Sequence, residues 1–148
     1  MKKLHVFSAI LLAGMLMVSC EKYPDGGLVK KGDDRLEGTW TLSNYYRNGA
    51  DETKLILITA YQESYQTGGV FSRSYKDGNG STVSETGTWE MPADNLTVNL
   101  MGISSISNFS NSNSTLSTSA VTITRMKKSE YWYEFTNGGD VHEFRFNR

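Results

Sequence analysis

Short segments in which apolar and polar residues alternate run from Leu36 to Asn147, with turn-forming residues between them. Successive side chains of a β-strand point to opposite faces, so this period of two predicts strands that bury one face. In the first segment Leu36, Trp40 and Tyr46 fall on the same face. The pattern predicts eight strands, at residues 36–46, 54–66, 70–76, 81–91, 96–101, 120–126, 130–136 and 141–147.

The turns between these segments favour an antiparallel arrangement. Asp77-Gly78-Asn79-Gly80 and Asn137-Gly138-Gly139-Asp140 predict hairpins, because their residues tolerate positive φ. Consecutive hairpins of this length predict an all-β fold, an eight-stranded antiparallel up-and-down barrel over residues 36–148. A two-sheet β-sandwich is the alternative that periodicity leaves open. Residues 102–119 are rich in Ser and Asn and are expected to form a loop or an irregular edge.

The N-terminal segment carries an export signal. Lys2 and Lys3 precede an apolar run, residues 4–18, which is shorter than the ~20 residues that a membrane-spanning helix needs. We therefore interpret residues 1–19 as a signal peptide. The segment ends in Met17-Val18-Ser19-Cys20, which resembles the lipobox of bacterial lipoproteins. The resemblance implies that Cys20 receives diacylglycerol and becomes the mature N-terminus.

Cys20 is the only cysteine of the chain, which excludes an intrachain disulfide. The residues after it, up to 35, are polar and contain proline and glycine, so residues 20–35 are expected to form a flexible tether. The lipoprotein resemblance also implies a location, namely the cell envelope of a Gram-negative bacterium. The protein would be anchored to the outer membrane through its N-terminal lipid, on the periplasmic or the surface face.

The first predicted strand carries a second resemblance. Its sequence, Leu36-Glu37-Gly38-Thr39-Trp40-Thr41-Leu42, resembles the opening strand of the lipocalin superfamily, in which Gly-x-Trp closes the floor of the barrel. An arginine near the last strand packs on that tryptophan in lipocalins. The resemblance therefore assigns the barrel floor to Gly38, Trp40 and Arg145, with Arg125 as the second choice for the arginine.

Charge and motif content argue against several functions. The net charge of −1 and the lack of a Lys/Arg run give no footprint for nucleic acid. His142 has no second histidine or cysteine at metal-ligand spacing, and no nucleophile elbow supports a Ser-His-Asp set. Acidic residues on the strands, such as Glu85 and Glu134, are expected to face water. We therefore expect no catalytic residue, metal or cofactor, and a monomer that is not an enzyme.

Ligand binding is the favoured function. An eight-stranded barrel is just wide enough to be filled by side chains or to hold one small ligand. The candidate ligand-lining residues are aromatic side chains of the predicted strands: Tyr61, Tyr65, Phe71, Trp89, Tyr133 and Phe144. We expect them to surround a small hydrophobic or amphipathic molecule. The alternative is a filled core, in a non-enzymatic module that binds a glycan or an envelope protein.

Overall fold

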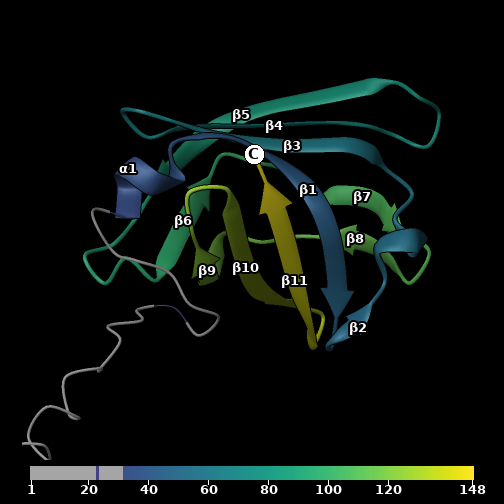
Figure 1. Cartoon of the computed structure of the whole chain (residues 1–148). Coiled ribbons are helices and arrows are strands. Elements are labelled where there is room, and N and C mark those ends of the chain that lie inside the picture. Colours follow the sequence, from purple (N-terminus) through teal and green to yellow (C-terminus); the bar gives the residue numbers. More distant parts are fainter. Residues whose placement is uncertain (1–22, 24–31) are drawn as a thin grey trace, which may run out of the picture.

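The computed structural model of the chain describes Tyr23 and residues 32–148 (Figure 1). The predicted signal peptide and Cys20 lie outside the described residues. No helix in the described part is long and apolar enough to cross a membrane. The elements are α1 (Gly32–Leu36), a 3-10 helix η1 (Thr53–Leu55) and the strands β1 (Gly38–Arg47), β2 (Ala50–Asp51), β3 (Thr59–Gln66), β4 (Val70–Lys76), β5 (Thr82–Glu90), β6 (Thr97–Met101), β7 (Ile106–Ser110), β8 (Asn113–Leu116), β9 (Ala120–Met126), β10 (Glu130–Asn137) and β11 (Asp140–Asn147).

Eight of the strands form a closed antiparallel barrel. They are hydrogen-bonded in the order β1, β3, β4, β5, β6, β9, β10 and β11, and β11 pairs with β1 to close the ring. Each neighbouring pair is antiparallel, and the chain visits the strands in sequence order. The predicted eight-stranded barrel is therefore confirmed, and the β-sandwich alternative is not the fold.

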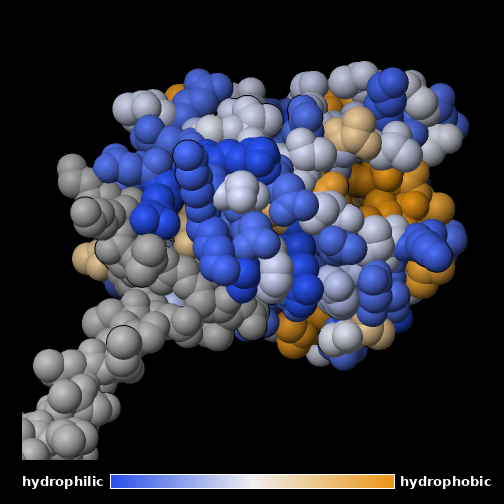
Figure 2. Space-filling model, in the orientation of Figure 1, coloured by the Kyte–Doolittle hydropathy of each residue, from blue (hydrophilic) through white to orange (hydrophobic). Residues whose placement is uncertain are grey.

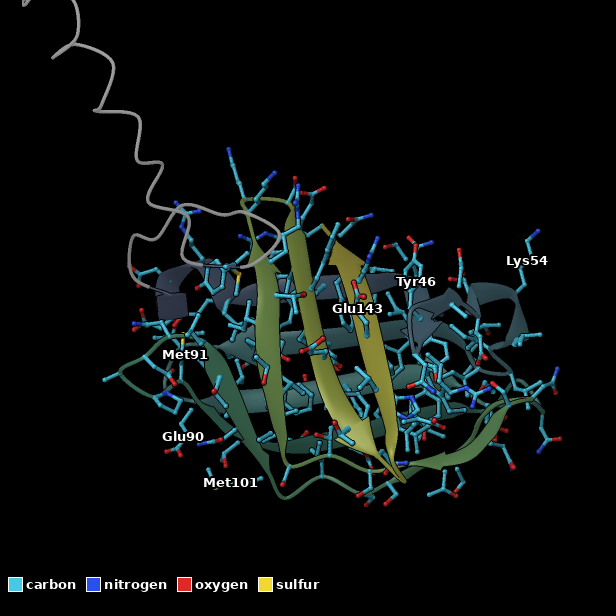
Figure 3. The ribbon with its side chains drawn as sticks, turned by 90° about the horizontal axis from the view of Figure 1, so that it is seen from below. Tyr46, Lys54, Glu90, Met91, Met101 and Glu143 are labelled. Carbon is cyan, nitrogen blue, oxygen red and sulfur yellow. The ribbon has the colours of Figure 1, made fainter. Side chains whose placement is uncertain are left out.

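Halfway along β1, the set of alternating side chains that points into the barrel changes. Its pairing with β11 shifts register between Leu42 and Asn44, which marks a β-bulge. One extra residue in a strand reverses the parity of all later side chains. Tyr45 is consequently fully buried, while Tyr46, predicted to share the face of Trp40, is only half-buried and lies beside Glu143 outside the wall (Figure 3).

The second strand is shorter than predicted. β3 begins at Thr59, and the preceding segment forms η1 and then pairs outside the barrel, where Ile56 bridges Ser110. Leu55 and Leu57, expected to share a face with Tyr61, are therefore 39% and 40% exposed. Figure 2 shows hydrophobic surface on the side of the molecule where β2 and the start of β3 lie.

Within residues 102–119, expected to form a loop or an irregular edge, residues 106–116 form a β-hairpin. β7 and β8 form a separate two-stranded sheet, and an isolated bridge from Ser110 of β7 to Ile56 joins it to the segment before β3. Ile106, Phe109 and Leu116 of this hairpin are buried, and the Phe109 ring stacks on that of Phe144 with centroids 5.2 Å apart. The β7–β8 hairpin thus packs on the core at one end of the barrel.

The other end of the barrel is covered by α1. Leu36 is fully buried, and its carbonyl accepts a hydrogen bond of 2.7 Å from the indole Nε1 of Trp40. Residues 32–35 were predicted to belong to the flexible tether, but they are helical. The buried Leu36 side chain and the Trp40 contact fix this helix against the core.

Candidate functional site

The floor of the barrel is built around Trp40, which is fully buried beneath an arginine side chain. That arginine is Arg148, whose guanidinium carbon lies 4.1 Å from the centre of the indole. Its Nη1 donates to the carbonyl of Glu37 at 2.7 Å and lies 2.6 Å from the position that a Cβ on Gly38 would occupy. Gly38 also has φ of +130°, so both its backbone and the arginine favour glycine here.

The assignment of Arg145 to this floor is wrong. Arg145 alternates with the buried Phe144 and Phe146 on β11 and therefore points outward. Its guanidinium lies over the Trp132 ring at 4.1 Å, and Arg125, the second choice, covers the same ring at 4.6 Å. Both predicted arginines thus pack on Trp132 at the outer surface of the barrel, and we call these three residues the outer stack.

The six candidate ligand-lining residues all lie in the barrel core. Each is at most 7% exposed, and their rings contact one another; Tyr65, for example, lies edge-on to Phe71 and to Trp89. Beside Tyr61, Tyr133 and Phe144 a space of about 10 Å³ remains. A single water needs roughly that much room. The predicted lining residues therefore fill this part of the core.

A carboxylate lies inside this aromatic core. Glu63 is 1% exposed and accepts hydrogen bonds of 2.8 Å from the hydroxyls of Tyr61, Tyr65 and Tyr133. Burial raises the pKa of Glu63, whereas the three hydroxyls and the guanidinium of Arg73 act in the opposite direction. The core is therefore aromatic but not purely apolar.

Glu63 belongs to a row of charged residues that crosses three strands. It pairs with Arg73 on β4, which pairs with Glu85 on β5. Arg73 Nε donates to Glu85 Oε2 at 2.7 Å, and its Nη2 donates to the carbonyl of Ser104. Arg73 thus ties the segment after β6 to the barrel wall.

This row is not among the site residues predicted from the sequence, although the alternation of residues along β3 and β4 indicates it. Glu63 alternates in step with Tyr61 and Tyr65, and Arg73 in step with Phe71. Acidic strand residues were expected to face water, and Glu85 is instead half-buried against Arg73. Strand parity is a stronger guide to orientation here than residue type.

His142 is also buried at the hairpin end of the barrel. Its Nδ1 lies 2.8 Å from the Tyr45 hydroxyl, and its ring stacks on Phe135 at 5.2 Å. Burial lowers the pKa of His142 and, with the help of nearby Glu52, raises that of Tyr45 to about 12. Both groups are therefore neutral at pH 7 and serve as a hydrogen-bonded pair.

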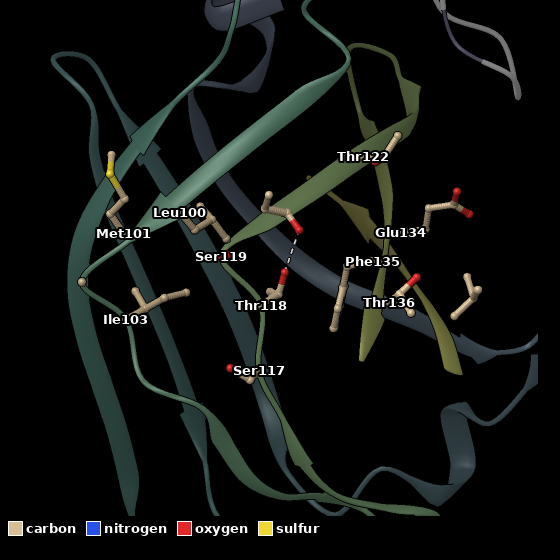
Figure 4. A pocket seen from close by; sticks show the side chains of 13 residues that line it. Leu100, Met101, Ile103, Ser117, Thr118, Ser119, Thr122, Glu134, Phe135 and Thr136 are labelled. Carbon is tan, nitrogen blue, oxygen red and sulfur yellow. Dashed lines mark hydrogen bonds between the residues drawn. The ribbon is translucent and has the colours of Figure 1, made fainter. Parts of the chain in front are cut away.

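An open cleft lies in the barrel wall, away from the predicted lining residues (Figure 4). The last contact along β6 and β9 is the hydrogen bond of 2.8 Å from the Leu100 N–H to the Ser119 carbonyl, and β9 pairs with β10 only as far as Thr122. Residues 117–119, which precede β9, line the space between the end of β6 and the end of β10. The resulting cleft has a volume of about 740 Å³ and is lined by Leu100, Met101, Gly102, Ile103, Ser117, Thr118, Ser119, Ala120, Thr122, Glu134, Phe135, Thr136 and Val141.

The lining of this cleft is amphipathic. Leu100 and Phe135 are buried core residues that form its inner wall, whereas Met101 and Val141 contribute exposed apolar surface. Several serine and threonine hydroxyls surround them. Ligand pockets typically measure about 300–1,000 Å³ and combine apolar walls with a few polar groups. Among the described residues, no group of three or more His, Cys, Asp or Glu side chains could hold a metal ion.

The closed eight-stranded barrel with its Gly-x-Trp floor defines a lipocalin-type fold, and comparison with known families agrees. The model of the lipocalin-like domain family matches residues 36–118, more than half of the chain. The chain belongs to this family. A lipocalin-like fold is generally a binding fold rather than a catalytic one.

A solved structure with a similar fold is that of a lipocalin-like protein from Bacteroides uniformis ATCC 8492. It superposes with a TM-score of 0.52 at 14% sequence identity, over 77% of this chain and 98% of that chain. At this identity the similarity concerns the fold alone. Curated protein sequences give no match to the chain.

Proposed function

We propose that this protein is an exported lipoprotein whose lipocalin-like domain binds a small amphipathic molecule in the wall cleft. The proposal rests on the difference in volume between the wall cleft and the space among the core aromatics. The cleft measures about 740 Å³, whereas the space among the core aromatics measures about 10 Å³. A drug-sized ligand fits only the first of these. The aromatic residues that were predicted to line a ligand then fill the barrel core and do not contact the ligand directly.

Anchoring through Cys20 is the second part of the proposal. It is supported by the lipobox-like Met17-Val18-Ser19-Cys20 at the end of an apolar segment that follows two lysines. Acyl chains contribute about 0.8 kcal/mol per buried CH₂, and stable anchoring takes more than one chain. A diacylated cysteine meets that requirement. The domain would then act at the outer membrane of a Gram-negative envelope, as a monomer without a cofactor or catalytic role.

Native mass spectrometry with a blocked cleft tests the binding site. A chain that begins at residue 21, and so keeps all described residues, is incubated with a crude envelope lipid extract. We expect a bound mass, and we expect Ala120→Trp, which places an indole in the cleft, to abolish it. The matched control is Ala93→Trp, on the exposed β5–β6 turn, which leaves binding unchanged. Equal binding by Ala120→Trp and the unmodified chain would exclude the cleft as the site.

The filled core favours a second candidate, an interaction module for a glycan or an envelope protein. Its specific support is the outer stack of Arg125, Trp132 and Arg145, which presents an aromatic ring between two guanidinium groups. Absence of a bound mass with all lipid classes would favour this second function. Capture of a partner by the unmodified chain but not by Trp132→Ala would then support it.

A further inference from the structure

We propose that the ligand of the wall cleft is a cationic amphiphile, a molecule with an ammonium-type head and an apolar tail. This inference rests on the proposed binding function of the cleft and adds the chemical class of the ligand. Its starting point is the charge of the lining. Among the residues that line the cleft, Glu134 is the single charged side chain, and no lysine or arginine is present.

Glu134 occupies a position where a carboxylate is unfavourable for the barrel itself. It lies directly across from Glu143 on β11 and from Thr122 on β9. Like charges at directly opposed positions destabilise a strand pair. Glu143 is compensated by Arg145, whose Nε lies 2.6 Å from its carboxylate. In the described part of the chain the Glu134 carboxylate forms no ion pair or hydrogen bond, so its charge is open to a ligand.

The rest of the cleft fits the tail of such a molecule. Figure 4 shows Glu134 and Thr136 on one side of the cleft and Met101 and Ile103 on the other. Leu100 and Phe135, on the inner wall, provide the apolar surface between them. A head held at Glu134 therefore leaves a tail free to cover this apolar wall, which removes apolar area from water.

The charges behind the inner wall do not favour an anion either. Leu100 and Phe135 also border the small space beside Glu63 and Arg73. The row there contains two carboxyl groups, Glu63 and Glu85, and one guanidinium, which already contacts Glu85. An anionic head in the cleft would thus be repelled by Glu134. Arg73, on the core side of the inner wall, is already paired with Glu85 and would not attract it.

Three probes with the same tail test the inference: n-octylamine, octan-1-ol and octanoate, titrated calorimetrically into the chain that begins at residue 21. We expect the amine to bind most tightly and octanoate most weakly. Glu134→Gln, nearly isosteric, should weaken amine binding roughly two- to fivefold and leave octanol binding unchanged, as for a solvent-accessible ion pair. The amine preference should also shrink as salt is raised. Glu37→Gln removes the same charge beside the α1 end of the barrel and should change nothing.

Different results would overturn the cationic class of the ligand and the binding function of the cleft. Equal affinities for the three probes, or a Glu134→Gln variant that keeps the amine preference, would overturn the cationic class while the cleft remains a binding site. Binding of none of the probes, together with no bound mass from lipid extract, would instead overturn the binding function itself.

Discussion

At the scale of single residues, the core holds ionisable groups whose polar atoms need hydrogen-bond partners. An ionised carboxylate buried without partners costs several kcal/mol, whereas hydrogen bonds to the charged form offset that cost. Tyr61, Tyr65 and Tyr133 supply these bonds to Glu63. A filled core with this network has less freedom to repack than a purely apolar one. The same network therefore opposes ligand entry into the barrel.

The histidine at the hairpin end gives a prediction for the pH dependence of stability. Burial lowers the pKa of His142 below 6.5, so between its unfolded and its folded pKa values the unfolded chain binds more protons than the folded chain. Stability must therefore fall as the pH drops through this range. His142→Gln keeps an acceptor for Tyr45 and removes the titration. Urea unfolding between pH 7 and 5 should show a smaller loss of stability for this variant.

The pKa of Glu63 is raised, so its contribution to this pH dependence has the opposite sign. Between its unfolded and folded pKa values the folded chain holds the extra proton, and stability falls as the pH rises. Both proteins in the comparison retain Glu63, so its contribution cancels. Identical pH dependence in the two proteins would show that His142 does not titrate differently on unfolding.

The barrel floor gives a second prediction at this scale. Trp40→Ala removes a fully buried indole and should lower the free energy of unfolding by about 3–5 kcal/mol. Arg148→Ala removes the guanidinium above that ring and should cost about 1 kcal/mol, whereas Arg145→Ala should leave the Trp40 environment unchanged. Denaturant unfolding of the three variants checks that the loss in free energy of unfolding is larger for Trp40→Ala than for Arg148→Ala. A loss below 1 kcal/mol for Trp40→Ala would contradict its place in the core.

At the scale of elements, the β7–β8 hairpin is attached to the barrel by a few side chains. Phe109 packs against Tyr45 and Phe144 with ring centroids 4.9 and 5.2 Å apart. Arg73 also contacts the Ser104 carbonyl, just before the hairpin. Short two-stranded hairpins are marginally stable alone. The hairpin therefore depends on these contacts for its position.

Phe109→Ala tests this dependence. Losing the fully buried ring should destabilise the domain by about 3–5 kcal/mol and leave a cavity under the hairpin. Hydrogen exchange should then show faster exchange in β7 and β8 than in β10 and β11. Uniformly faster exchange throughout the barrel would instead show that the hairpin and the barrel open as one unit.

Periodicity predicted the barrel well and its local irregularities poorly. Alternation identified all eight wall strands, because each has one buried face. It failed at Tyr46, where a bulge reverses parity, and at Leu57, where the segment pairs with the hairpin outside the barrel. The cleft could not be predicted at all. It lies where the ladders of β9 with β6 and β10 end, and residues 117–119 carry no pattern that indicates this.

At the scale of the whole molecule, the proposal joins a membrane anchor to a binding domain. Cys20→Ala should leave the protein without lipid, because the acyl acceptor is lost. Labelling with a fatty-acid analogue and separation of soluble from membrane fractions check this expectation. The variant should lose the label and leave the membrane fraction. A variant that stays with the membranes would contradict anchoring through this cysteine.

In the proposed function, a ligand binds in the wall cleft and not among the core aromatics. Amide NMR spectra of the chain from residue 21, recorded during titration with n-octylamine, locate the contact most directly. We expect the largest shifts on residues 117–120 and on Glu134 and Phe135. Largest shifts on Tyr61, Tyr65 and Phe71 instead would place the ligand inside the barrel and contradict binding in the wall cleft.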